Sequence, residues 1–232
     1  MRLAIMQPYF FPYIGYFQLI RAVDLFVIYD NVQYTKKGWI NRNRILEQGR
    51  EALISLPLKK ASDFLDVRDR ELASDFRKDK LRNRIREAYR RAPCFPQAFP
   101  VVDGALGHPD GNLFRFLLHT IRTVCAYLGI GTEVAISSTL PVDHTLRGQD
   151  RVIALCRQVG AREYVNPIGG QSLYSREHFF SQGIDLKFLQ PEIIPYTQAG
   201  NDFIPSLSII DVMMFNSAED ISRRLVSEYH LI

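Results

Sequence analysis

Short apolar runs alternate along the chain with segments whose apolar residues recur at helical spacing. Runs rich in aliphatic and aromatic residues predict buried β-strands. Apolar residues three and four positions apart predict helices that bury one face. We expect strands at 3–6, 25–29, 133–136, 163–165 and 186–189, and helices at 13–22, 112–128, 151–159, 176–182, 207–215 and 218–229.

This order of elements predicts the fold class. A strand, a short helix and a second strand fit within the first thirty residues, which is a βαβ unit with parallel strands. The alternation returns in the second half of the chain, and we find no internal repeat, low-complexity tract or long linker. We therefore expect an α/β protein with a doubly wound, mostly parallel sheet, and a single domain over residues 1–232.

The middle of the chain departs from the alternation. Residues 45–46 and 52–58 flank a turn at 47–49 and predict a β-hairpin, with Pro57 at an edge or at a strand end. Together with the helical segment that follows, this hairpin makes residues 45–110 a candidate subdomain inserted into the parallel-sheet domain.

A strongly basic segment at 77–91 follows the hairpin. Leu81, Ile85 and Ala88 recur at helical spacing, so a helix with one apolar stripe and a cationic remainder is expected. The cationic face could be solvated, or it could meet a phosphate group or an acidic membrane surface. Prolines then predict an irregular connection, at Pro93, Pro96 and Pro100.

The composition is that of a globular protein. The chain has 232 residues, of which 47% are hydrophobic and 23% charged, so it can bury a core that holds a concave site. Its three cysteines form no CxxC pair, which excludes a zinc ribbon and predicts buried free thiols. The five histidines show no HxH, HxxxH or HExxH spacing, so we expect no metal site.

Charge and the N-terminal segment bear on location and ligands. A formal charge of +4 favours anionic ligands weakly. The first twenty residues are apolar, but Gln7, Pro8 and Pro12 interrupt the run and no small-residue cleavage site follows. We therefore predict no signal peptide and no transmembrane segment, and expect a cytoplasmic protein.

In open α/β sheets, ligands bind beyond the carboxyl ends of the strands, and two polar loops follow the first two predicted strands. The first loop could let a ligand approach a helix N-terminus through Gly15, or it could be a rigid packed corner. In the second, Asp30 could act as a general base or accept a sugar hydroxyl, although an ordinary surface loop fits as well. The candidate ligand-binding residues are Gln7, Tyr9, Tyr13, Gly15 and Tyr16 in the first loop, and Tyr34, Lys36, Trp39, Asn41 and Arg42 in the second.

Two further polar loops follow the later strands. Asn166, Gly169 and Gly170 could form an anion-binding nest or an ordinary turn, and the segment lacks the GK[ST] of a Walker A motif. The fourth loop, 195–198 and 201–211, places Tyr196 and Gln198 as candidate ligand contacts and Asp211 as a second candidate catalytic carboxylate. Helix capping and a structural aspartate are the alternative for this loop.

A catalytic triad is not expected. Ser137, His144 and Asp143 can be drawn as one, but no GxSxG motif accompanies them.

The start of the first predicted helix, Tyr13-Ile14-Gly15-Tyr16, is similar to the His-x-Gly-His signature of HxGH nucleotidylyltransferases and pantothenate-synthetase-like ligases. The glycine matches, whereas tyrosines replace both histidines. Tyrosine donates a hydrogen bond to phosphate but supplies no imidazolium charge. The likeness therefore implies the fold more than the reaction.

A resemblance over most of the chain is more specific. The segments that carry it lie between residue 3 and about residue 217, and they resemble the WbqC-like family: MQPYFFPYIGYFQLI, FVIYDNVQYTKKGWINRNRI, NPIGGQSLY, PYTQ and PSLSIIDVMMFN. The resemblance implies a role in the biosynthesis of lipopolysaccharide O-antigen or a related surface glycan.

The likeness to the ligase signature and the resemblance to the WbqC-like family together predict an enzyme. We expect a transferase or ligase that forms an amide by moving an acyl or aminoacyl group onto a nucleotide-linked amino sugar, with ATP or an activated acyl donor as co-substrate and other glycan-assembly enzymes as partners. A nucleotidyltransferase or glycosyltransferase is an alternative, although no DxD triplet is present. A non-catalytic scaffold that binds nucleotide-linked sugars is another. Nucleic-acid binding is expected only if the donor is an aminoacyl-tRNA.

Overall fold

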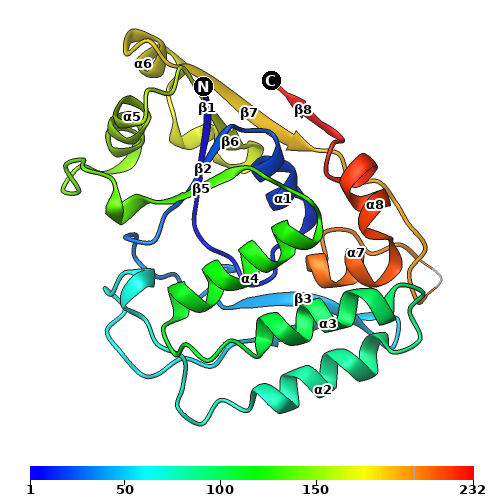
Figure 1. The fold of residues 1–232 in the computed structure, drawn as a ribbon. Coiled ribbons are helices and arrows are strands. Elements are labelled where there is room, and N and C mark those ends of the chain that lie inside the picture. The colour runs from blue at the N-terminus through cyan, green and yellow to red at the C-terminus, as the bar shows by residue number, and fades with distance from the viewer. Residues whose placement is uncertain (201) are drawn as a thin grey trace.

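The computed structural model describes residues 1–200 and 202–232, so Asn201, in the fourth polar loop, lies outside the described residues. A six-stranded sheet forms the centre of the fold, in the order β5-β2-β1-β6-β7-β8, and all its neighbours are parallel except β7 and β8 (Figure 1). The strands are β1 Arg2–Met6, β2 Leu25–Ile28, β5 Glu133–Ile136, β6 Glu163–Pro167, β7 Asp185–Pro191 and β8 Tyr229–Leu231.

Helices cover both faces of this sheet. Because successive strand residues point to opposite faces, Leu3 and Ile5 of β1 pack on one side and Ala4 on the other. The first face is covered by α5 Gly148–Gln158 and α6 Arg176–Ser181, and the second by α1 Ile14–Arg21, α4 Leu113–Tyr127 and α7 Ile209–Phe215. The expected doubly wound α/β fold is confirmed.

A separate two-stranded sheet is formed by the expected hairpin, β3 Arg42–Glu47 and β4 Arg50–Ser55. Its two-residue turn, Gln48 and Gly49, has φ angles of 52° and 73°. Two positive φ angles in succession match the twist of the flanking strands. The hairpin starts earlier than predicted, because Arg42 pairs with Ser55 in the antiparallel register. It shares its buried residues with the core around α1, α4 and α7.

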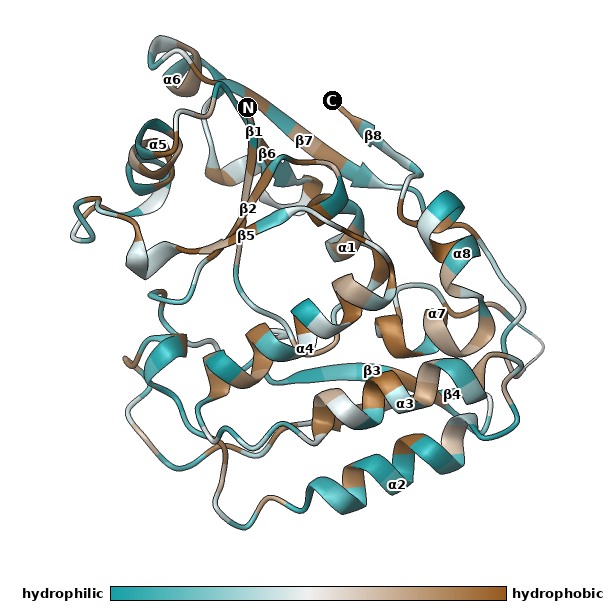
Figure 2. Cartoon of the chain, viewed as in Figure 1, coloured by the Kyte–Doolittle hydropathy of each residue, from teal (hydrophilic) through white to brown (hydrophobic). Residues whose placement is uncertain are grey.

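The basic segment is a helix, α2 Lys78–Tyr89, as predicted. It buries Leu81, Ile85 and Tyr89, and the rest of its surface is hydrophilic (Figure 2). Several of its cations already have protein partners: Arg82 pairs with Asp103, and Arg84 pairs with Glu47 at 2.9 Å. None of the helices in the described residues combines the length and the apolar character that a bilayer-spanning helix requires.

Our prediction of an irregular, proline-rich connection after this helix is wrong. The segment forms a regular helix, α3 Phe95–Leu106. Pro96 lies in its first turn, where the missing N–H would have had no helical partner. Pro100 lies inside the helix and removes one main-chain hydrogen bond. Burial of Phe99, Val102 and Leu106 in the core offsets that loss.

The predicted C-terminal helix at 218–229 is also wrong in its extent. Helix α8 covers Ala218–Asp220, a π-helical turn continues to Leu225, and the chain then forms strand β8. Strand β8 pairs antiparallel with β7, through Leu231 with Leu189. Only three residues form this strand, so periodicity in the sequence was too short to reveal it.

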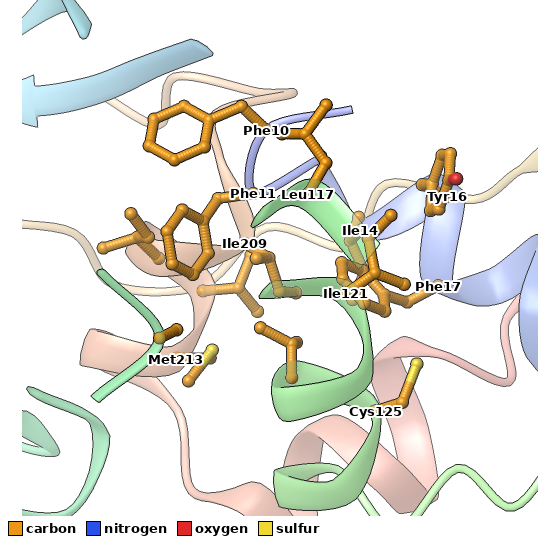
Figure 3. Packing of buried hydrophobic residues seen from close by; sticks show 14 of the residues in the cluster. Phe10, Phe11, Ile14, Tyr16, Phe17, Leu117, Ile121, Cys125, Ile209 and Met213 are labelled. Atoms are coloured by element: carbon orange, nitrogen blue, oxygen red, sulfur yellow. The ribbon is translucent and has the colours of Figure 1, made fainter. Parts of the chain in front are cut away.

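The first polar loop is anchored in the core. Phe10 and Phe11 are fully buried and belong to the same core cluster as Ile121 of α4 and Met213 of α7 (Figure 3). Ser208, at the start of α7, donates a hydrogen bond to the Phe11 carbonyl at 2.7 Å. The loop is thus a rigid corner that fixes the position of its neighbouring polar residues.

Candidate functional site

The order of strands reverses between β1 and β6. From β1 the chain moves outward to β2 and β5, and from β6 it moves the other way to β7. Strand β1 pairs with β2 up to Met6 and Ile28, but with β6 only up to Leu3 and Tyr164. The carboxyl ends of β1 and β6 therefore diverge at the topological switch point, which is where open α/β sheets bind ligands.

Two helices begin at this edge of the sheet, from opposite faces (Figure 1). Helix α1 follows the loop after β1, and α5 lies on the crossover from β5 to β6. Because crossover helices run antiparallel to the strands, both N-termini lie at the carboxyl edge. The partial positive charge of each N-terminus makes this edge favourable for an anionic ligand.

A cleft of about 320 Å³ lies beside the N-terminus of α1. It brings together residues from the first, second and fourth polar loops and from β3: Tyr9, Pro12, Tyr13, Trp39, Asn43, Arg44 and Ser206. Its volume lies within the range of small-molecule sites, which are commonly lined by aromatic groups with a few polar ones.

Trp39 forms one wall of this cleft and is 39% exposed. The guanidinium groups of Arg42 and Arg44 lie 5.8 and 5.4 Å from its ring centroid. Arg44 is held by two hydrogen bonds to Glu51, at 2.9 and 3.0 Å. The wall is therefore an ordered aromatic surface with cations beside it, which suits a base or sugar that carries negative charge.

Tyr9 and Tyr13 also line the cleft. Burial raises the pKa of Tyr9 to about 12 and also raises the pKa of Tyr13. Both hydroxyl groups therefore stay protonated at neutral pH and can donate hydrogen bonds to a ligand.

Gly15 makes room for the side chain of Tyr13. A Cβ atom added there would lie 2.5 Å from the Tyr13 ring, so the glycine lets that ring fold over the first turn of α1. Tyr16 is buried, and its hydroxyl group donates to the carbonyl oxygen of Gln7 at 3.0 Å. Gln7 and Tyr16 thus stabilise the loop from within.

Asp30 joins the carboxyl end of β2 to that of β5. It is 2% exposed, and its carboxylate accepts hydrogen bonds from the Ser138 amide at 2.9 Å, the Ser138 hydroxyl at 2.6 Å and the Ser137 hydroxyl at 2.9 Å. With its oxygens engaged in this way, Asp30 is better placed to hold the neighbouring loop than to take a proton from a substrate.

A chain of hydrogen bonds through Ser137 and Asn31 connects His144 to the Asp30 carboxylate. The side chain of Asn31 contacts the Ser137 hydroxyl and, at 3.1 Å, Nδ1 of His144. Ser137 has one proton but faces oxygens of both Asp30 and Asn31, so the Asn31 amide fits better with its nitrogen toward Ser137. The amide oxygen then accepts from Nδ1 of His144. The ring is exposed, and its Nε2 has no partner among the described residues, so it is free to accept a proton.

Asn166 and Gly170 approach each other on the far side of the switch point. The Tyr164 hydroxyl donates to the Asn166 side chain at 3.1 Å. A Cβ atom added at Gly170 would lie 2.1 Å from the Asn166 side-chain nitrogen, so this glycine makes room for Asn166. At Gly169 an added Cβ atom would meet open space.

Asp211 is fully buried and forms the centre of a separate cluster. Its carboxylate accepts hydrogen bonds from the Tyr89 hydroxyl at 2.9 Å, the Tyr196 hydroxyl at 2.6 Å and the Gln198 amide at 2.8 Å. Burial raises the pKa of Asp211, and these hydrogen bonds act in the opposite direction. Three expected site residues, Asp211, Tyr196 and Gln198, therefore bind one another and tie α7 to the loop after β7.

The other residues predicted in the second loop fix that loop. Tyr34 donates to Asn41 at 2.8 Å, and Lys36 pairs with Asp63 at 2.9 Å. Arg42 donates to backbone carbonyl groups of the same loop in addition to lying against Trp39. Within the described residues, no three acidic, histidine or cysteine side chains are grouped closely enough to hold a metal ion.

Several residues around the cleft and Asp30 were not predicted as site residues. Asn43, Arg44, Ser138 and Arg151 were not singled out, and Ser137 and His144 were considered only as members of a triad that was not expected. The sequence did contain a signal for the two serines. They directly follow the strand predicted at 133–136, and polar residues at the ends of strands are candidates for ligand binding. The triad that was not expected is not formed: Ser137 contacts Asp30 and Asn31, while Asp143 accepts hydrogen bonds from Thr145.

Comparison with known proteins supports the resemblance. The profile of the WbqC-like protein family matches residues 7–223. Uncharacterized protein Rv1507c of Mycobacterium tuberculosis is 31% identical over 224 residues, which is 94% of this chain and 95% of that protein. No solved structure matches significantly.

Proposed function

The chain belongs to the WbqC-like protein family, and we propose that it is an enzyme of surface-glycan biosynthesis that acylates a nucleotide-linked amino sugar. The family likeness supports the glycan context, which includes lipopolysaccharide O-antigen. The reaction would occur in the cytoplasm, where nucleotide-linked sugars are made, beside other enzymes of glycan assembly.

The single observation that carries the proposal is the cleft beside α1. It combines the exposed face of Trp39, the tyrosine hydroxyls of Tyr9 and Tyr13, and the cation of Arg44 at the carboxyl edge of a parallel sheet. Aromatic faces bind the apolar faces of sugars and bases, whereas the hydroxyl and guanidinium groups bind oxygen atoms. A nucleotide-linked sugar has a base, the apolar face of a sugar ring and phosphate oxygen atoms, so it offers a partner to each of these protein groups.

The proposed step is amide formation. The sugar amine attacks the carbonyl carbon of an acyl thioester or acyl phosphate, a C–N bond forms, and the bond to the thiolate or phosphate leaving group breaks. The amine must lose a proton, and Nε2 of His144 is the open acceptor at this edge. Asp30, through Ser137 and Asn31, is a positioning residue that orients the imidazole ring.

The direct test combines binding with turnover. Thermal unfolding of the purified protein would be followed with a set of nucleotide-linked amino sugars, ATP and acyl thioesters, and products would be identified by mass spectrometry. An acylated nucleotide-linked sugar supports the proposal. A rise in Tm with the sugar and no product from any donor would favour a non-catalytic binder. No rise in Tm with any nucleotide-linked sugar would contradict the proposal.

Truncating the aromatic wall should weaken this binding. Trp39→Ala is expected to raise the Kd for the nucleotide-linked sugar roughly tenfold to a hundredfold, because one aromatic stacking contact contributes about 1–3 kcal/mol. Calorimetric titration measures the change. Phe180→Ala is the matched control, since Phe180 is also aromatic, is 80% exposed, and lies on α6 outside the cleft. An equal loss of affinity in both variants would show that the cleft is not the binding site and would contradict this part of the proposal.

A further inference from the structure

Arg151 is a buried cation without a matching anion. The residue is 8% exposed, and its Nε has no hydrogen-bond partner among the described residues. Its guanidinium group lies over the Tyr29 ring, 4.8 Å from the centroid. Within the described part of the chain, no acidic side chain forms an ion pair with it, and its guanidinium group has a polar neighbour in Nδ1 of His144, at 3.4 Å.

That contact leaves the cation largely unsatisfied. In the arrangement described above, Nδ1 of His144 carries the proton that it donates to Asn31, at 3.1 Å, so it has no lone pair with which to accept a hydrogen bond from Arg151. Burying a charge with no partner is costly, so a buried arginine of this kind is normally matched by a carboxylate or by a bound anion.

The first turn of α5, which contains Arg151, also has backbone N–H groups without an acceptor among the described residues. Arg151 lies in the first turn of α5, an eleven-residue helix that starts at Gly148 without a side-chain cap. The backbone N–H groups of residues 148–150 have no hydrogen-bond acceptor among the described residues. Asp150, the acidic residue of this turn, is turned to His178, which it contacts at 3.1 Å. A further cation, Arg147, immediately precedes the helix.

We propose that Arg151 and the first-turn amides of α5 bind the diphosphate of a nucleotide-linked ligand. A phosphoryl group accepts several N–H donors at once, which matches a guanidinium group beside the N-terminus of a helix. This inference rests on the proposed function for the identity of the complete ligand. It assigns the phosphates to the face of the sheet that carries α5, across the carboxyl edge from the cleft beside α1.

The test uses inorganic pyrophosphate, without metal ions, in calorimetric titration at low ionic strength. The wild-type protein should bind it, and Arg151→Met should bind at least about tenfold more weakly, the loss expected for one charge-assisted contact. Arg176→Met is the matched control, because Arg176 also lies over an aromatic ring, that of Phe188 at 5.3 Å, but is exposed. Its affinity should stay within about twofold of the wild type.

A second measurement separates this role from a purely structural one. If the Arg151 charge is unpaired until an anion binds, the Arg151→Met variant without ligand should have the same Tm as the wild type or a higher one. Pyrophosphate should raise the Tm of the wild type but not that of the variant. Should the methionine variant not fold, Arg151→Lys, which keeps the charge but loses the planar fork, should fold and bind more weakly. The proposal is overturned if the wild type does not bind pyrophosphate, or if either variant binds it as the wild type does.

The outcome is distinguishable from failure of the proposed function, because pyrophosphate contains neither sugar nor acyl donor. A nucleoside diphosphate, titrated in parallel, should bind more tightly than pyrophosphate if the phosphates belong to a nucleotide. Equal affinity for both would indicate a site for free phosphate groups and would contradict the assignment to a nucleotide. Arg151-dependent binding of both, without acylation of any sugar, would preserve this site while removing the proposed reaction.

Discussion

Replacing Asp211 by alanine is expected to lower the free energy of unfolding by about 2–4 kcal/mol, because the two tyrosine hydroxyls and the amide group that it accepts from would lose their acceptor in a buried place. The cost is moderated because the buried carboxylate is itself unfavourably desolvated. Chemical denaturation followed by circular dichroism measures the change. A loss below about 0.5 kcal/mol, the size of a typical surface substitution, would contradict a structural role for this cluster.

Asp211 should also make stability depend on pH. Burial raises its folded-state pKa above the ordinary value of an aspartate, so the folded state holds this proton at a pH where the unfolded chain has released it. The contribution to stability is full below the unfolded-state pKa. It falls as pH rises from there through the raised folded-state pKa.

The Asp211→Asn variant isolates this effect, since it removes the titration and keeps an oxygen that can accept a hydrogen bond. Its free energy of unfolding should lack the decline that the wild type shows over this pH window. Asp75→Asn, at an exposed aspartate, is the matched control and should keep the decline. If both variants retain it, Asp211 is not its source.

Replacing His144 by alanine should have the largest effect on turnover. If Nε2 accepts the amine proton, kcat should fall by about 10²–10⁴-fold, the usual contribution of a general base, while the Kd of the nucleotide-linked sugar changes little. Because the ring is exposed, free imidazole should reach the vacated position and restore part of the activity of the variant. Steady-state kinetics with and without imidazole measures both effects.

Two variants make this expectation specific. His230→Ala removes another exposed histidine, one on β8 that contacts Glu192, and should leave kcat nearly unchanged. Asp30→Asn should lower kcat less than His144→Ala does, because it disturbs the orientation of the ring without removing it. Full activity of His144→Ala would exclude the ring as proton acceptor, whereas a loss that imidazole does not restore would indicate a structural role.

The fold class was predictable because its signals are local. The apolar runs before residues 7, 30 and 137 were long enough to indicate buried strands, and the helical spacing between them implied parallel crossovers. Even the turn at 48–49 was visible, since a glycine there accommodates a positive φ angle. In contrast, α3 was missed because its prolines argue locally against a helix that core burial stabilises.

The candidate site was predictable only as a set of loops. The rule that ligands bind beyond carboxyl strand ends selected the loops that contain Tyr9, Tyr13 and Trp39, and in the structure these three residues line one cleft. It could not separate residues that face this cleft from those that hold the protein together. Gly15 looked like room for a ligand, yet the ring of Tyr13 occupies that room.

The sequence by itself determined the alternating strands and helices and the polar character of the edge where they meet, because both follow from neighbouring residues. Only the tertiary structure decided the partners of each side chain. Asp30 meets Ser137 across 107 residues, and Asp211 meets Tyr89 across 122. Whether a carboxylate or a guanidinium group is paired or left unpaired depends on such distant contacts, since burial and pairing together set its energy and no local pattern records them.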